Sequence, residues 1–251
     1  MLKNNIVPIV LHRVVESQSI NFEDITIDSL KKILSKDSSS YITVKDLEYG
    51  LVESNKFLYM ITFDDGYLSD FTIVFPLLKL LGINATFFIN TCNIGKPGFL
   101  DWQMIIEMNQ NGNIFGSHGH NHLKMTEISM EESKFEFNKS KELYEINTGI
   151  EMSFFSFPYG LYNNNLLELS LKCGYSNCCI SKHGIIHSLE SLIPRNSING
   201  SMSDSDISKI LNPTGYIRAK WILEDATKNI LKKIIREKNY LVLRRIVLKF
   251  F

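Results

Sequence analysis

Short apolar runs alternate along the chain with longer segments in which apolar positions recur every three or four residues. The runs are rich in β-branched and aromatic residues, which favours buried strands, and the longer segments favour amphipathic helices. Strands and helices that alternate in this way are typical of a parallel sheet covered by helices. The predicted strands are residues 6–11, 41–44, 57–63, 84–89, 113–115 and 152–157, and the predicted helices are residues 27–34, 45–53, 71–81, 101–108 and 130–144.

The apolar run at residues 57–63 is followed by two adjacent aspartates and a glycine. We expect Asp64 and Asp65 to end the apolar run at the end of the strand and Gly66 to supply a sharp turn. Neighbouring side chains at a strand end point to opposite sides, so the two carboxylates have different roles. One can bind a metal while the other stays free as a base. Taken alone, an Asp-Asp-Gly triplet is more often a turn with a helix N-cap.

A second polar motif, GSHGHNH at residues 116–122, follows the short apolar run at residues 113–115. His118 and His122 are four residues apart, which lets two imidazoles meet one ion if the segment turns helically after the strand. With one aspartate they form a familiar set for a catalytic divalent metal that keeps open positions for water and substrate. Zinc is the metal expected for this set, and cobalt or nickel could also occupy it.

Length and composition fit one globular domain. The chain has 251 residues, of which 44% are hydrophobic and 22% charged, so it can bury a large core and needs no disordered or fibrous interpretation. The apolar run before His12 is too short for a secretion signal or a membrane span, which predicts a cytoplasmic location. The four cysteines show no paired metal spacing and are expected to be reduced.

Charge patterning separates the C-terminal end from the rest. Residues 212–251 carry ten Lys or Arg against three Asp or Glu, a net charge of +7, while the whole chain sums to zero. We therefore expect a domain at residues 1–211 and a basic amphipathic helical extension at residues 212–251. The extension suits peripheral binding to the inner face of an anionic membrane, docking on a partner, or packing on the domain with its basic residues outward. The charges of residues 130–144, Glu136 among them, predict a solvated helix face with local ion pairs.

Three motifs in this order, TFDDG at residues 62–66, GSHGHNH at residues 116–122 and FSFPYG at residues 155–160, resemble those of the polysaccharide deacetylase family. This is the NodB-homology fold, carbohydrate esterase family 4. PIVLHRV, PLLKLLGINATFFI and LIPRNSI match as well, so that the resemblance covers about residues 6–198. It implies an α/β fold, a distorted (β/α) barrel, here with a C-terminal helical extension. It also implies a metal-dependent amidase acting on an N-acylated sugar.

The resemblance also implies roles for single residues. Asp64 matches the catalytic base, and the metal ligands match Asp65, His118 and His122. The backbone N–H of Tyr159 matches the donor to the developing oxyanion, while Pro158 only shapes that turn. Trp102 is the candidate for an aromatic residue at the substrate groove, with ordinary core packing as the alternative.

Two positions depart from the family pattern. An arginine commonly found two residues before the proline is Ser156 here, and Arg195 fits an alternative arginine that would lower the pKa of Asp64 by charge attraction. A surface role for Arg195 is the other interpretation. The family's late general-acid histidine is missing, so the acid is His187, His183 or not a histidine. His12 could line the mouth of the site, although a lone histidine beside an arginine is more often structural.

These observations predict a metal-dependent deacetylase that removes an acetyl or formyl group from an amino sugar in a cell-surface glycan or its precursor. The alternative is a catalytically weak or inactive carbohydrate-binding protein on the same fold. The basic extension favours a lipid-linked or membrane-proximal glycan. Nucleic-acid binding is not expected, because the basic residues gather at one end and are not interleaved with aromatic residues over a broad face.

Overall fold

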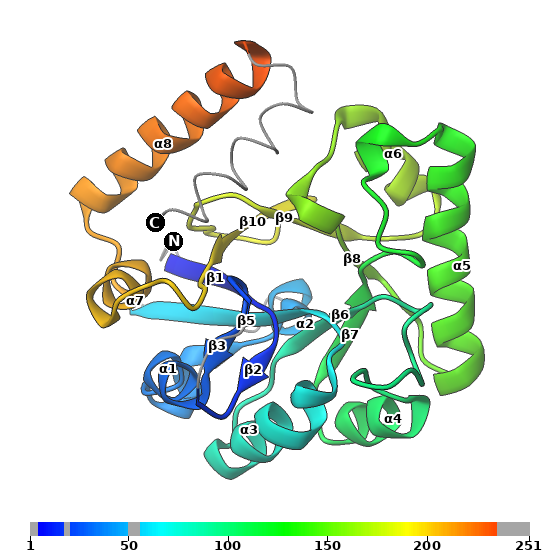
Figure 1. Cartoon of the computed structure of the whole chain (residues 1–251), viewed down its shortest axis with the longest axis horizontal. Helices are drawn as coiled ribbons and strands as arrows, with labels where there is room; N and C mark the ends of the chain where they lie inside the picture. The colour runs from blue at the N-terminus through cyan, green and yellow to red at the C-terminus, as the bar shows by residue number, and fades with distance from the viewer. Residues whose placement is uncertain (1–4, 18–20, 50–55, 235–251) are drawn as a thin grey trace. The chain divides into compact units, whose positions relative to one another are not determined.

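The computed structural model describes residues 5–17, 21–49 and 56–234 of the chain (Figure 1). The chain divides into two compact units, Met1–Asn212 and Pro213–Phe251. In the second unit the described element is the helix α8, Gly215–Ile234. Among the described residues no helix combines the length and the apolar character needed to cross a membrane. The rest of the predicted extension, residues 235–251, lies outside the described residues.

Seven parallel strands of the described chain close into a barrel. Strand β1 pairs with β5 on one edge and with β10 on the other, which closes the ring. The short β4, Tyr41–Ile42, pairs with the first half of β5. Strand β6 pairs with the second half of β5 on the same edge. In their order around the ring, the strands are β1 Asn5–Leu11, β10 Leu192–Ser197, β9 Asn177–Ser181, β8 Phe154–Ser156, β7 Ile114–Ser117, β6 Thr86–Ile89 and β5 Phe57–Asp65.

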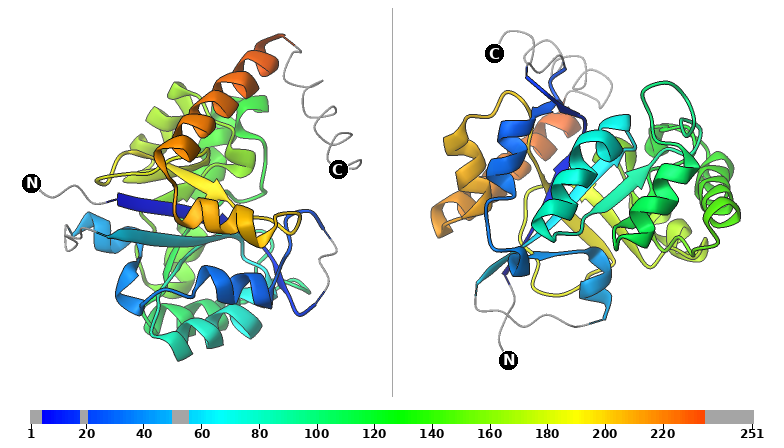
Figure 2. Two further views of the ribbon diagram at one scale, coloured as in Figure 1. Left: turned by 90° about the vertical axis from the view of Figure 1, so that its left-hand side faces the viewer. Right: turned by 90° about the horizontal axis from the view of Figure 1, so that it is seen from below.

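Helices surround the strands of the first unit, and α3, α4 and α5 lie outside the barrel in all views (Figures 1 and 2). A separate two-stranded sheet pairs β2, Val14–Val15, with β3, Ile25–Thr26. The helices are α1 Ile27–Ile33, α2 Val44–Glu48, α3 Phe75–Leu81, α4 Trp102–Gln110, α5 Met130–Thr148, α6 Asn164–Lys172 and α7 Asp204–Leu211, with short helical turns η1 Ser38–Ser40, η2 Asp70–Val74, η3 Met125–Glu127 and η4 Pro158–Gly160. The predicted barrel of parallel strands and helices is therefore confirmed.

Local chemistry explains where element ends differ from the prediction. Thr43 ends β4 early because its side chain accepts the N–H of Asp46, whose carboxylate reaches back to the Thr43 N–H and caps α2. The predicted helix over residues 45–53 ends at Glu48, and residues 50–55 lie outside the described residues. The central strand β5 is two residues longer than the predicted run at residues 57–63, since it stays paired with β6 through Asp65, and the two aspartates lie at its end as expected.

The barrel interior is layered from apolar to polar along the strands. Inward-facing Leu58 and Met60 of β5 belong to an apolar cluster in the first half of the barrel. Because side chains on one face of a strand recur every two residues, Thr62 and Asp64 continue this inward row toward the end of β5. The inward row of β10 runs in the same way from apolar Ile193 to Arg195. Polar groups therefore gather at the C-terminal ends of the strands, where parallel barrels carry their active sites.

The four cysteines form no disulfide in the structure. All four are free thiols, as the sequence predicted. Burial raises the pKa of the Cys178 and Cys179 thiols to about 12, so both stay protonated at neutral pH.

Candidate active site

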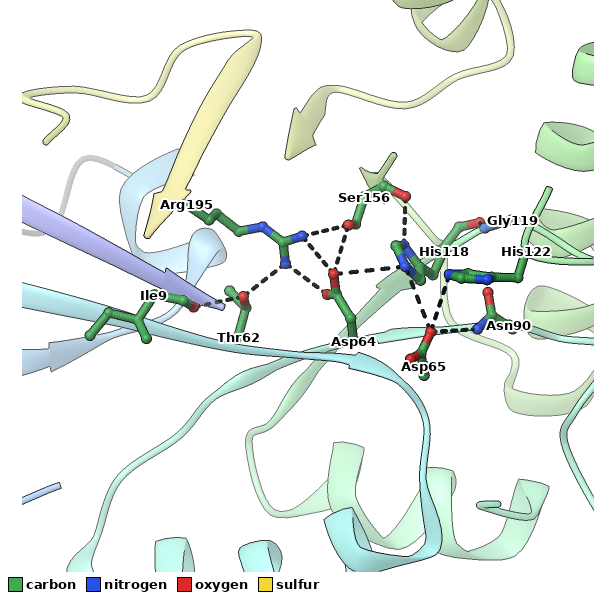
Figure 3. Close-up of polar contacts among 11 residues, drawn as sticks. Ile9, Thr62, Asp64, Asp65, Asn90, His118, Gly119, His122, Ser156 and Arg195 are labelled. Carbon is green, nitrogen blue, oxygen red and sulfur yellow. Dashed lines mark hydrogen bonds and ion pairs between the residues drawn. The ribbon is translucent and has the colours of Figure 1, made fainter. Parts of the chain in front are cut away.

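Three side chains from two strand ends form a cluster suited to a metal ion (Figure 3). One donor atom each of Asp65, His118 and His122 lies within 4.8 Å of the others. Asp65 Oδ1 is 3.7 Å from His118 Nε2 and 3.4 Å from His122 Nε2, and it accepts a hydrogen bond of 3.0 Å from Asn90 Nδ2. Ligands about 2.1 Å from a tetrahedral ion lie about 3.4 Å apart, so this donor set fits a zinc-sized divalent cation.

The two imidazoles meet through a loop rather than through the helical turn that the spacing suggested. His118 follows β7 directly, and the backbone then takes left-handed conformations at Gly119, with φ 83°, and at His122, with φ 56°. These bends bring the ring centroids of His118 and His122 to 4.9 Å. Asp65 also has a left-handed conformation, with φ 81°, which turns the chain away from β5. The predicted ligands are therefore together, although the predicted local structure is wrong.

The protonation state of His118 suits a metal ligand. Its Nδ1 is 2.8 Å from the Ser156 carbonyl oxygen, which can only accept, so Nδ1 carries the proton. Burial lowers the pKa of His118 to about 4, although Asp64 opposes this change. At neutral pH the imidazole is uncharged, and its Nε2 presents a lone pair toward Asp65.

Asp64 lies in a separate buried ion pair with Arg195. The guanidinium donates from Nη1 to Asp64 Oδ1 and from Nη2 to Oδ2, both at 2.7 Å. Nη1 also donates to Thr62 Oγ1 at 2.8 Å, and that hydroxyl donates to the Ile9 carbonyl at 2.8 Å. Burial alone would raise the pKa of Asp64, but the charge and hydrogen bonds of Arg195, with contributions from His118 and His12, together outweigh burial and hold the pKa well below its usual range. Asp64 is therefore ionised at neutral pH.

Ser156 occupies the position where the family pattern has an arginine. Its hydroxyl accepts from Arg195 Nη2 at 2.6 Å and donates to Asp64 Oδ2 at 3.2 Å. The arginine thus reaches the Asp64 carboxylate from β10 instead of β8. The Ser156 hydroxyl hydrogen-bonds both members of the ion pair. The structure places Arg195 against Asp64 and not on the surface.

The turn Pro158–Gly160 lies beside His122 of the metal cluster. Tyr159 has a left-handed backbone, with φ 60°, and its half-exposed ring lies 4.7 Å from the His122 ring. Pro158 is buried at the start of this turn. Their proximity to the cluster agrees with the expected placement, and the Tyr159 N–H as oxyanion donor stays a prediction. Trp102 is half-buried at the start of α4, and its role in substrate binding also stays a prediction.

His187 does not belong to this site. The neighbouring Ile186 exchanges backbone hydrogen bonds with Ile6 near the start of β1, and Ile6 is in register with Leu58. Asp64 lies further along β5 by six residues, about 20 Å at about 3.3 Å per residue. The prediction of His187 as the acid is therefore wrong, because the loop after β9 returns to the opposite end of the barrel.

His12 takes a position that the sequence analysis ranked low. It follows β1 directly, and Leu11 pairs with Phe63, so His12 lies level with Asp64 on the adjacent strand. Its charge is close enough to contribute to the lowered pKa of Asp64. A cavity of about 300 Å³ opens beside it, lined by His12, Asn21, Phe22, Glu23, Asp24 and Tyr67. The sequence signal that could have identified His12 is its position directly after a predicted strand, a position that Asp64 and Asp65 share.

The lowered pKa of His118 predicts how stability depends on pH. Because the pKa falls from 6.5 to about 4, the unfolded state binds more protons than the folded state between these values. The free energy of unfolding of the metal-free protein should therefore decrease as the pH falls through this range. Urea unfolding at a series of pH values measures this decrease, and His118→Gln should show a shallower one. Equal slopes for both proteins would contradict the lowered pKa.

Comparisons with known proteins identify the family and the fold. A family model described as polysaccharide deacetylase matches residues 52–178. A Bacillus subtilis (strain 168) protein named "Putative polysaccharide deacetylase YxkH" is 33% identical over 116 residues, which cover 46% of this chain and 42% of that protein. An "Uncharacterized 30.6 kDa protein in fumA 3'region" of Geobacillus stearothermophilus is 32% identical over 126 residues, 49% of this chain and 46% of that protein. The chain thus matches less than half the length of these relatives.

Solved structures share the fold at low sequence identity. The Streptococcus pyogenes deacetylase PplD, solved in complex with acetate, has a TM-score of 0.74 at 19% identity, over 84% of this chain and 100% of that chain. The Bacillus cereus polysaccharide deacetylase BC0361 has a TM-score of 0.72 at 18% identity, over 84% of this chain and 70% of that chain. These likenesses support the NodB-type barrel, and the family model covers about half of the sequence. The chain belongs to the polysaccharide deacetylase family.

Proposed function

We propose that this protein is a metal-dependent hydrolase that removes the N-acyl group from an amino sugar of a glycan. The observation that carries the proposal is the Asp65, His118 and His122 cluster beside the Asp64–Arg195 pair. When bound there, a divalent cation would polarise the acyl carbonyl and lower the pKa of a water molecule. Two imidazole nitrogens and one carboxylate oxygen favour zinc, and cobalt or nickel fit the same donors.

Asp64 has the position and charge of the base. Its Oδ2 is 3.8 Å from His118 Nε2, so the carboxylate lies beside the proposed metal position. Arg195 holds the carboxylate in one orientation and in its unprotonated form. In the proposed reaction Asp64 accepts the proton of the attacking water, while Asp65 stays committed to the metal.

His12 is our candidate for the proton donor to the departing amine. Release of an amine requires a proton on the nitrogen, and histidine is the side chain that most often supplies it. His12 lies level with Asp64, and its buried Nδ1 has no hydrogen-bond partner within the described part of the chain. It lines the cavity next to the cluster, where His187 cannot reach.

The cavity supports a sugar as substrate. Aromatic Phe22 and Tyr67 line it together with the polar side chains of Asn21 and Glu23. Pockets that combine apolar faces with a few polar groups bind and orient small ligands, and aromatic rings can pack against the apolar face of a sugar. Relatives named as polysaccharide deacetylases support an acylated glycan as the substrate.

A membrane-proximal substrate in the cytoplasm is a further part of the proposal. The described helix α8 contains five of the basic residues of the extension, Arg218, Lys220, Lys228, Lys232 and Lys233. Each lysine or arginine near an anionic leaflet contributes about 1 kcal/mol of attraction. Such binding would keep the enzyme beside a lipid-linked precursor of a cell-surface glycan.

The main test is amine release from N-acetylated and N-formylated glucosamine oligomers. Wild-type protein should release amine with zinc and lose this activity after chelation. Asp64→Asn should keep its metal and lose turnover by about 10²–10⁴-fold, because a general base is removed. Equal loss of metal and turnover would mean that the roles of the two aspartates are exchanged. Wild-type protein that binds metal and sugar without releasing amine would instead support the carbohydrate-binding alternative.

A matched pair of histidine variants tests the proton donor. His12→Gln should lower kcat by about 10²-fold or more, because the leaving amine loses its proton source. His187→Gln should leave kcat unchanged, since His187 lies at the other end of the barrel. Steady-state kinetics of both variants, at matched metal content, provide the measurement. The opposite order of effects would overturn the assignment of His12.

A further inference from the structure

Glu136 is a fully buried carboxylate on a helix whose other acids are exposed or only partly buried. The sequence predicted a solvated position for it, and this prediction is wrong, since Glu136 is 1% exposed while Glu131, Glu132 and Glu142 of α5 are exposed. It follows Ser133 by three residues and precedes Ser140 by four, so the three lie on one helix face. All three are buried on the side of α5 that packs toward the barrel.

The carboxylate of Glu136 holds the loop between the two histidine ligands. Its Oε2 accepts the backbone N–H groups of His120 at 2.8 Å and of Asn121 at 2.7 Å. Its Oε1 accepts from the Asn121 side-chain amide at 2.7 Å. Both backbone donors lie between His118 and His122, so Glu136 fixes the segment that joins the two imidazoles.

The loop needs such support because its conformation is unfavourable by itself. His122 has a left-handed backbone, with φ 56°, a conformation that is unfavourable for a residue with a side chain. Glu136 is assisted by Ser117, whose hydroxyl accepts the N–H of Gly119 at 3.0 Å. The backbone N–H of Cys92 donates to the His120 carbonyl at 3.1 Å. The polar groups of the loop are thus bound from three sides, which sets the direction of both imidazoles.

Charge gives Glu136 a second role. Among the described residues, no lysine, arginine or histidine lies within ion-pair distance of its carboxylate. A buried carboxylate without a cationic partner is unfavourable, even when neutral donors satisfy its oxygens. A divalent cation at the cluster would meet one negative charge from Asp65, because Asp64 is neutralised by Arg195. Glu136 then supplies the second negative charge of the centre without touching the metal.

We propose that Glu136 is a positioning residue of the metal centre: it fixes the His118–His122 loop, and its charge strengthens divalent-metal binding. The inference rests on the proposed metal-dependent function. Groups that orient metal ligands in this way typically change metal affinity by about 10–100-fold when they are replaced.

Three variants separate the charge of Glu136 from its hydrogen bonds. Glu136→Gln keeps one oxygen for both backbone N–H groups, and the Asn121 amide can turn to accept from the new NH₂ group, so the charge alone is lost. Glu136→Ala loses the charge and all three hydrogen bonds. Glu142→Gln is the control, because Glu142 is an exposed acid of the same helix that bonds Lys139 at 3.2 Å.

The measurement is the Zn²⁺ dissociation constant of the metal-stripped full chain, obtained by competition with a chelator of known affinity. We expect weakening by about tenfold in Glu136→Gln and by about 100-fold in Glu136→Ala, with Glu142→Gln unchanged. The visible absorption spectrum of bound Co²⁺ should change in Glu136→Ala, since the imidazoles are no longer held in place. Circular dichroism and urea unfolding of the metal-free proteins establish whether each variant folds.

The outcomes distinguish this inference from the proposed function. If wild-type protein and Glu136→Gln bind Zn²⁺ with the same dissociation constant, the charge contributes nothing. The inference is then overturned, while the proposed metal-dependent function stands. If wild-type protein does not bind Zn²⁺, the proposed metal-dependent function fails, and the inference fails with it. Should Glu136→Ala not fold, Glu136→Gln decides, because it keeps the hydrogen bonds.

Discussion

The site depends on one buried ion pair, between Arg195 of β10 and Asp64 of β5. Both side chains are almost fully buried, and a hydrogen-bonded pair at such depth loses about 3–5 kcal/mol if one partner is removed. Thr62 and Ser156 satisfy further donors of the guanidinium, which also lies 5.1 Å from the Phe88 ring centroid. The pair therefore ties β5, β8 and β10 together across the barrel interior, and it defines the polar layer above the apolar cluster.

The same pair explains how two adjacent aspartates come to serve different purposes. Asp64 faces inward in the row of Met60 and Thr62, where Arg195 meets it. Asp65 is the next residue and has a left-handed backbone, which aims its carboxylate at the two imidazoles instead. Strand alternation thus divides base and ligand between neighbours. Because Arg195 neutralises Asp64, Asp65 is the one negatively charged ligand of the proposed metal site. The charge of Glu136 would then add to that of Asp65 without direct contact with the metal.

Much of this could be predicted from the sequence, because it follows from local patterns. The alternation of apolar runs and amphipathic segments predicted a parallel sheet covered by helices, the family resemblance implied the barrel, and the motifs placed Asp65, His118 and His122 together. What failed depends on the closure of the barrel. His187 is near Arg195 in sequence, but the loop between β9 and β10 returns to the opposite end of the barrel. His12 is far from Asp64 in sequence and level with it in space, because β1 pairs with β5. Glu136 was missed because its face of α5 carries serines, which do not signal burial.

The most direct test of the central claim, a divalent metal held by Asp65, His118 and His122, is anomalous diffraction from crystals grown with Zn²⁺. Data collected on both sides of the zinc absorption edge locate the metal independently of any assumed chemistry. The account predicts one strong peak about 2.0–2.2 Å from an Asp65 oxygen and from the Nε2 atoms of His118 and His122. A metal held elsewhere, or no peak between these three side chains at saturating Zn²⁺, would contradict it.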